Sequence, residues 1–83
     1  MVYQNRKASR EIRRRLSVNL KRLRRARGYT QAELANFCQL SKNYISNIEQ
    51  RRVNVTLASL EALAYGLGCT EEDLLRRPQK IGD

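Results

Sequence analysis

The stretch QAELANFCQLSKNYISNIEQ, residues 31–50, predicts two short helices joined by a tight turn. Thr30, just before it, can cap the first helix through its hydroxyl, and Glu33 stands where it closes a capping box. After a turn at residues 39–40, Ser41 can cap the second helix in the same way. Each helix has only about two turns, so packing against the rest of the chain must stabilise both.

Apolar side chains mark one face of each of these helices. The residues expected to face inward are Leu34, Ala35, Phe37, Cys38, Ile45 and Ile48. The residues left on the outer face of the second helix are Lys42, Asn43, Tyr44, Ser46 and Asn47. Two capped helices with a short turn are the layout of a helix-turn-helix, whose second helix lies in the major groove of DNA. The stretch therefore predicts a fold and a partner together.

An ordered set of residues between positions 16 and 75 matches a known family. The matching residues are Leu20, Leu23, Arg24, Gly28, Thr30, Gln31, Glu33, Leu34, Ala35, Ser41, Ile45, Ser46, Ile48, Glu49, Leu57, Leu60, Leu63 and Leu67. This combination resembles the Cro/cI-type (XRE) family of helix-turn-helix regulators. Within that family, residues 44–46 and 54–57 look most like the small controller proteins of restriction–modification systems. The resemblance implies a compact, all-α, five-helix domain of the lambda-repressor type.

The chain departs from the family pattern in three places. The turn between the two helices usually contains glycine, because its φ is often positive, and this chain has Gln39 there. The family also tends to have Arg-Gly after the glutamate, where this chain has Gln50 and Arg51, and Val55 replaces a common proline. A residue other than glycine in the left-handed region costs about 1 kcal/mol. We therefore expect the surrounding contacts to offset strain at Gln39.

Helical periodicity and capping residues extend the all-α prediction beyond the motif. A first helix is expected over residues 9–27, and residues 51–55 form a loop before a fourth helix and a short fifth one. The expected caps and stops are Gly28, Thr56, Gly68, Thr70 and Pro78. The apolar residues expected in the core from the first and fourth helices are Ile12, Leu16, Leu20, Leu23, Leu57, Leu60, Leu63, Ala64 and Leu67. The predicted division is a flexible arm at 1–8, a DNA-binding domain at 9–77 and a tail at 78–83.

The net charge of +9 is concentrated at the front of the chain. Residues 1–27 hold eleven Lys or Arg against one acid, +10; residues 28–52 sum to +1 and residues 53–83 to −2. A basic segment beside a helix-turn-helix is the electrostatic pattern expected for binding phosphates. For Arg10, Arg13 and Arg14, contact with DNA and a role in solubility remain equal alternatives.

The outer face of the second motif helix supplies the candidate base contacts. Lys42 can donate to guanine, Asn43 and Asn47 can pair with adenine, and Tyr44 can touch a thymine methyl or a phosphate. The alternative is a solvated polar face. The candidate phosphate contacts, taken partly from the resemblance, are Gln31, Thr30, Ser41, Arg24, Arg51 and Arg52. The resemblance also implies a salt bridge between Arg24 and Glu49, against the alternative of two separate solvated charges.

Spare apolar residues near the C-terminal end suggest a homodimer. Tyr65, Leu74 and Leu75 could form a two-fold interface, and such a dimer would read two half-sites of a palindrome about 34 Å apart. The alternative is a monomer in which these residues complete the core. A regulator of this kind would repress by blocking RNA polymerase or activate by touching it.

Composition argues against other classes of protein. There is no His, no Cys/His metal spacing, no phosphate loop and no nucleophile–base pair, so we expect no enzyme, cofactor or small-molecule substrate. Cys38 and Cys69 are expected as buried free thiols in the cytoplasm. No signal peptide or membrane span is evident. The open alternatives are an antitoxin-type module that binds a toxin and its own operator, and a membrane-binding amphipathic helix at residues 9–27.

Overall fold

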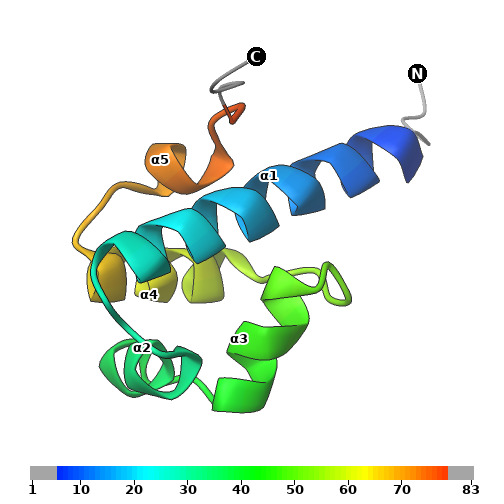
Figure 1. Ribbon diagram of the computed structural model, residues 1–83. Helices are drawn as coiled ribbons and strands as arrows, with labels where there is room; N and C mark the ends of the chain where they lie inside the picture. Colours follow the sequence, from blue (N-terminus) through cyan, green and yellow to red (C-terminus); the bar gives the residue numbers. More distant parts are fainter. Residues whose placement is uncertain (1–5, 79–83) are drawn as a thin grey trace.

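The computed structural model describes residues 6–78, and these form five helices and no strand. The helices are α1 (Arg6–Ala26), α2 (Gln31–Cys38), α3 (Lys42–Glu49), α4 (Leu57–Leu67) and α5 (Glu71–Leu75). The long helix α1 crosses the others, and α2 and α3 lie together on one side of it (Figure 1). Helix α1 packs on α3 and α5, and α4 packs on α2 and α5. The expected all-α, five-helix fold is confirmed.

Each of the four later helices begins at a hydroxyl cap, as expected. The side-chain oxygens of Thr30, Ser41, Thr56 and Thr70 each accept a hydrogen bond of 3.0 Å from the backbone N–H three residues on. In α2 and α5 the third residue also bonds back to the N–H of the cap, which completes a capping box. These local bonds satisfy N–H groups that the helix itself leaves free, so they set where each helix starts.

Helix α1 begins three residues earlier than its sequence suggested. The expected start was Ser9, at the end of an arm over residues 1–8, but the helix already runs from Arg6 and ends at Ala26. Arg, Lys and Ala are strong helix formers, so the helix continues through Arg6, Lys7 and Ala8 without a break. The rest of the expected arm, residues 1–5, and the end of the expected tail, residues 79–83, lie outside the described residues.

The core lies where the five helices meet. Its buried apolar residues are Leu16, Leu20, Leu34, Ala35, Cys38, Ile45, Ile48, Leu60, Leu63, Ala64, Leu67 and Leu74. Because the stripe of α1 at Leu16 and Leu20 is buried against the other helices, it is not available to a membrane surface. Among the described helices, none is long and apolar enough to cross a bilayer.

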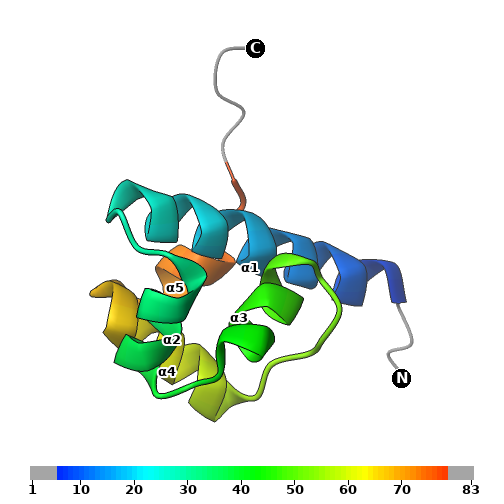
Figure 2. The same ribbon diagram turned by 60° about the horizontal axis from the view of Figure 1, so that its bottom comes forward.

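Three residues expected in the core are exposed instead. Ile12 is 42% exposed, because the N-terminal part of α1 extends past the helices packed beneath it (Figure 2). Phe37 is 48% exposed and rests on the ring of Tyr29, with centroids 4.9 Å apart. Leu57, the first residue of α4, is 85% exposed. Those three expectations were wrong, because periodicity gives the face of a helix and not the extent of what covers it.

Two of the departures from the family pattern, Gln39 and Arg51, fall on left-handed backbone. Gln39 has φ 56° and ψ 40°, and Arg51 has φ 61°. The turn at Gln39 is closed by a 2.9 Å bond from the Leu40 N–H to the Ala35 carbonyl. The turn at Arg51 is closed by its own N–H, which donates to the Ile48 carbonyl at 3.0 Å. These bonds and the packing around them offset a cost of about 1 kcal/mol at each residue.

Candidate nucleic-acid interface

Helix α3 has one buried side and one polar side. Ile45 and Ile48 are at most 2% exposed and anchor the helix in the core. On the other side Lys42 and Asn43 are exposed in the first turn, and Asn47 lies half-buried one turn later. The structure therefore brings these predicted base contacts onto one outer surface. Tyr44 is also half-buried and packs against the core, so only part of its ring is accessible.

An ion pair ties the end of α3 to α1. Arg24 Nε lies 2.6 Å from Glu49 Oε2, and Arg24 Nη2 lies 3.1 Å from Glu49 Oε1. Their side chains are 11% and 4% exposed. The third guanidinium nitrogen, Nη1, donates to the Tyr29 carbonyl at 2.8 Å. The pair that the resemblance implied is thus present in the structure. Because the guanidinium is buried and makes these bonds, Arg24 acts as a brace between α1 and α3, and its contact with a phosphate stays a prediction.

Two further groups converge on Glu49. The side-chain amide of Gln31 donates to Glu49 Oε1 at 3.0 Å, and the Ser17 hydroxyl donates to the Glu49 carbonyl at 2.6 Å. Burial on its own raises the pKa of Glu49. The hydrogen bonds from Arg24 and Gln31, with the charges of Arg24 and Lys21, outweigh burial and hold that pKa below its usual 4.5. Glu49 is therefore ionised at neutral pH, and it orients α3 through both its side chain and its backbone.

The remaining predicted phosphate contacts surround α3. Thr30 and Ser41 are exposed helix caps, as expected, at the first turns of α2 and α3. Arg51 and Arg52 are exposed in the turn that follows α3. Gln31 opens α2, but its side chain is occupied by Glu49, so its backbone N–H is the group left for an anion.

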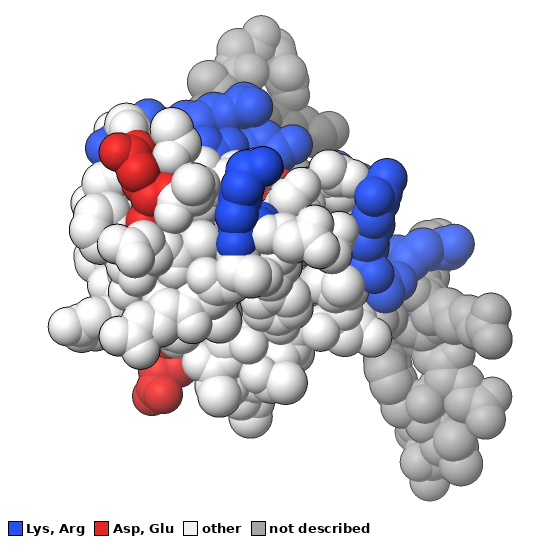
Figure 3. All heavy atoms as spheres, turned by 90° about the horizontal axis from the view of Figure 1, so that it is seen from below, with Lys and Arg blue, Asp and Glu red and all other residues white. Residues whose placement is uncertain are grey.

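Basic side chains frame the face that carries α2 and α3. Seen from that side, Lys and Arg gather along two margins around a mostly uncharged centre, and acidic side chains appear only near the edges (Figure 3). Phosphates of a duplex flank the groove that a helix enters, so cations along the margins of this face suit DNA.

The arginines early in α1 are partly engaged within the protein. Arg14 and Arg15 both bind Glu11, at 3.0 and 3.3 Å, and these bonds lower the pKa of Glu11 to about 2. Arg13 donates to the Asn54 side chain at 3.3 Å and so reaches the loop after α3. That contact gives Arg13 a structural partner, whereas the sequence offered only DNA contact or solubility.

Two buried polar residues of α1 were missed by sequence reasoning. Ser17 and Asn19 are 1% exposed and lie between core leucines. Ser17 bonds to the end of α3, and the Asn19 amide donates to the carbonyls of Leu74 and Arg76 at 2.9 and 2.7 Å. They connect α1 to α3 and α5 respectively. The only sign of these contacts in the sequence was that Ser17 and Asn19 are small polar residues next to the apolar stripe of α1.

The three residues expected at a dimer interface differ in how exposed they are. Tyr65 is 84% exposed and Leu75 is half-buried, so both have accessible surface. Leu74 is fully buried under α1 and belongs to the core of the monomer, so its expected place in an interface is wrong. Leu74 is held inward because Asn19 bonds to its carbonyl.

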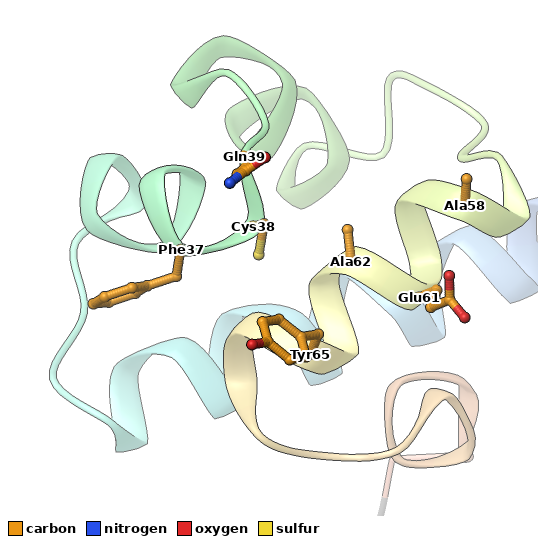
Figure 4. A pocket seen from close by; sticks show the side chains of 7 residues that line it. All are labelled: Phe37, Cys38, Gln39, Ala58, Glu61, Ala62 and Tyr65. Carbon is orange, nitrogen blue, oxygen red and sulfur yellow. The ribbon is translucent and has the colours of Figure 1, made fainter.

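A groove of about 450 Å³ runs between α2 and α4. Phe37 and Tyr65 lie at the same end of it, and the Cys38 side chain points across it toward α4 (Figure 4). Both cysteines are free, and burial raises the pKa of each thiol, so both stay protonated at neutral pH. Over residues 6–78, no cluster of His, Cys, Asp or Glu could hold a metal ion.

Comparisons with known proteins agree with this geometry. A profile described as a helix-turn-helix domain matches residues 15–77. The Neisseria hypothetical transcription factor, from Neisseria meningitidis, is 37% identical over 65 residues, which are 78% of this chain and 61% of that protein. A crystal structure of that factor has a TM-score of 0.79 and covers 82% of this chain and 78% of its own.

Two more proteins are similar over most of their own length. The restriction–modification controller protein C.AhdI from Aeromonas hydrophila is 29% identical, with a TM-score of 0.72 over 75% of this chain and 94% of that one. The uncharacterised HTH-type transcriptional regulator y4dJ from Sinorhizobium fredii is 35% identical over 78% of this chain and 84% of that protein. The chain spans 61% of the Neisseria factor, 53% of the regulator DdrOP3 from Deinococcus deserti and 46% of the immunity repressor of Bacillus phage phi105. The chain has two capped helices, a braced α3 and a match to the helix-turn-helix profile over residues 15–77. It therefore belongs to the Cro/cI-type (XRE) helix-turn-helix family of DNA-binding transcriptional regulators.

Proposed function

We propose that this protein regulates transcription as a homodimer that binds a palindromic operator, with α3 in the major groove of each half-site. The observation that carries the proposal is the braced polar face of α3. Lys42, Asn43 and Asn47 face outward from a helix whose far end is held by the buried pair of Arg24 and Glu49. A helix that reads bases must be held rigidly, because a good base contact depends on two fixed donor–acceptor distances.

The three outward side chains match the edges of bases. Asn43 and Asn47 each offer one donor and one acceptor, the pattern that pairs with adenine, and Lys42 donates to guanine. The accessible part of Tyr44 suits a thymine methyl or a phosphate.

Contacts to phosphates would set the register of α3 on the duplex. Arg51 and Arg52 follow α3 directly, and the caps Thr30 and Ser41 lie beside free N–H groups at the starts of α2 and α3. Backbone N–H groups at a helix start attract anions. Contacts of this kind do not read sequence, but they position the base-reading side chains.

A second copy of the chain would contribute the other half of the interface. Tyr65 on α4 is 84% exposed, beside Phe37 at 48%, and large aromatic side chains at this exposure favour a protein contact. A two-fold dimer sets two copies of α3 about 34 Å apart, one turn of DNA. On a promoter such a dimer would exclude RNA polymerase or contact it. No specific observation favours the alternative of an antitoxin.

The test is selection of bound sites from random duplex DNA. We expect wild-type protein to enrich a palindrome with half-sites about one helical turn apart. Asn47→Ala should lose about 1–3 kcal/mol on that site and keep its affinity for unrelated DNA. Glu72→Gln, on the exposed surface of α5, is the control and should bind like wild type. Equal losses on both DNAs for Asn47→Ala, or no enriched sequence at all, would contradict the proposal.

A further inference from the structure

We propose that a cationic hollow on α1, formed by Lys21, Arg22 and Arg25 together with Arg51, binds the phosphodiester backbone of the DNA beside the groove that α3 enters. The inference rests on the DNA-binding function proposed above and adds α1 as a second element that contacts DNA. The hollow has a volume of about 610 Å³, and it lies between the outer side of α1 and the turn that carries Arg51. No carboxylate lines it.

The four cations of the hollow differ in their partners from three other basic residues of α1. Arg14 and Arg15 are paired with Glu11, and Arg24 is paired with Glu49. Across residues 6–78, by contrast, none of the four cations of the hollow forms an ion pair with a carboxylate. Grouping unpaired cations raises their mutual repulsion, and an anion bound among them relieves it.

The backbone of Arg51 fixes the position from which its side chain reaches the hollow. Its φ of 61° is uncommon for a side chain other than glycine, and the family tends to have glycine there. Strain of this kind persists where the surrounding structure maintains it. Here the Arg51 N–H is fixed to the Ile48 carbonyl at 3.0 Å, and its side chain lines the hollow with Lys21 and Arg25.

The hollow borders the end of α3. Ser17, which also lines the hollow, donates to the carbonyl of Glu49, the last residue of α3. Any anion held there would therefore sit next to the helix that we propose reads the bases. Basic side chains along the margin of the face in Figure 3 agree with a contact at the edge of the interface.

A polymer of phosphates fits this arrangement better than a single small anion does. Lys21 and Arg25 are four residues apart on one helix, so their backbone positions differ by about 6 Å along its axis. Successive phosphates on one DNA strand rise about 3.4 Å. The row of cations therefore spans about two phosphates, and the open shape of the hollow lets a strand pass through it.

The test measures how DNA affinity depends on salt. Arg25→Ala and Lys21→Ala are compared with Arg77→Ala, which removes the same charge from an exposed arginine outside the hollow. Removing one phosphate contact should reduce the slope of log K against log salt by about 0.9. Between 50 and 200 mM salt each hollow variant should thus lose about 3.5-fold less affinity than wild type. The loss at low salt should be equal on selected and unrelated duplexes, while Arg77→Ala keeps the wild-type slope.

Each contrary outcome separates the two proposals. If wild-type protein binds no duplex in a salt-dependent way, DNA binding itself fails. If wild type binds but Arg25→Ala, Lys21→Ala and Arg77→Ala share one slope, the proposal for the hollow alone is overturned. Inorganic phosphate is the second probe. Two results together would assign the hollow to a free anion instead of DNA. Phosphate would shift the amide NMR signals of Lys21 and Arg25, and the hollow variants would bind DNA like wild type.

Discussion

Gln39 shows that one residue can carry local strain without changing the fold. Its φ of 56° lies in the left-handed region, where glycine has no Cβ to clash. The exposed side chain makes no hydrogen bond that compensates within the described residues, so the cost is met by the turn and the core around it. A residue that adopts this conformation without strain should therefore raise the free energy of unfolding.

We expect Gln39→Gly to stabilise the protein. Relief of the strain, about 1 kcal/mol, should exceed the extra freedom that glycine gives the unfolded chain, leaving a gain of up to about 0.5 kcal/mol. The control is Gln50→Gly, because Gln50 has φ −94°, where glycine relieves nothing and should destabilise. Thermal unfolding of the three proteins checks this. A lower Tm for both glycine variants would show that the left-handed turn holds no recoverable strain.

Glu49 predicts how stability responds to acid. Its folded pKa lies below its usual 4.5, so its contribution to stability is present above about pH 4.5 and is lost as pH falls through the folded value. Glu49→Gln keeps the shape of the side chain but not its charge. Urea unfolding should show wild type more stable than Glu49→Gln at pH 7, with the difference in the free energy of unfolding narrowing as the pH falls below 4.5. A difference independent of pH would mean that the charge of Glu49 contributes nothing.

At the scale of helices, the close approach of α2 and α4 depends on Gly66. A methyl group at Gly66 would collide with the sulfur of Cys38. Apart from that clash, alanine is the better helix residue by about 0.5–1 kcal/mol. The small residue at this crossing therefore sets how near the two helices can lie, and with it the width of the groove in Figure 4.

We expect Gly66→Ala to destabilise the protein by about 1–3 kcal/mol, the usual cost of overpacking. The same change in a Cys38→Ala background should cost much less, because the sulfur is gone. Chemical denaturation of both single variants and the double variant gives the coupling between the sites. Additive effects would show that α2 and α4 can move apart without cost.

At the scale of the whole molecule, charge and apolar surface occupy different places. Basic side chains frame the face with α2 and α3, while the exposed aromatic rings of Phe37 and Tyr65 lie at the end of the groove between α2 and α4. This separation lets one surface meet DNA while another meets a second copy of the chain.

We expect Tyr65→Lys to produce a monomer in sedimentation and to weaken binding to a two-site operator far more than binding to one half-site. Burial of a charge in the interface opposes association, and loss of the dimer removes the second half-site. The control is Glu72→Gln, which changes net charge by the same amount on the exposed surface of α5. A dimer that survives Tyr65→Lys would place the interface elsewhere.

Features that depend on neighbours along the chain could be predicted from the amino-acid sequence. Hydroxyl caps, turn residues and 3.6-residue periodicity are local features. Four helix starts followed from them, as did the buried residues of α2 and α3 other than Phe37, which is exposed. The ion pair of Arg24 and Glu49 was foreseen only through the resemblance to a family, since no local rule joins residues 25 positions apart.

The packing of the helices determines which apolar faces are covered and which polar groups come into contact. Leu74 is buried and Leu57 is exposed, although both stand at apolar positions of a helix, because the extent of the neighbouring helices differs at the two places. The bonds of Asn19 to the chain near Leu74, and of Ser17 to Glu49, span 55 and 32 residues. Such contacts arise when helices pack, and they complete the braced α3 that the helix-turn-helix stretch alone could only suggest.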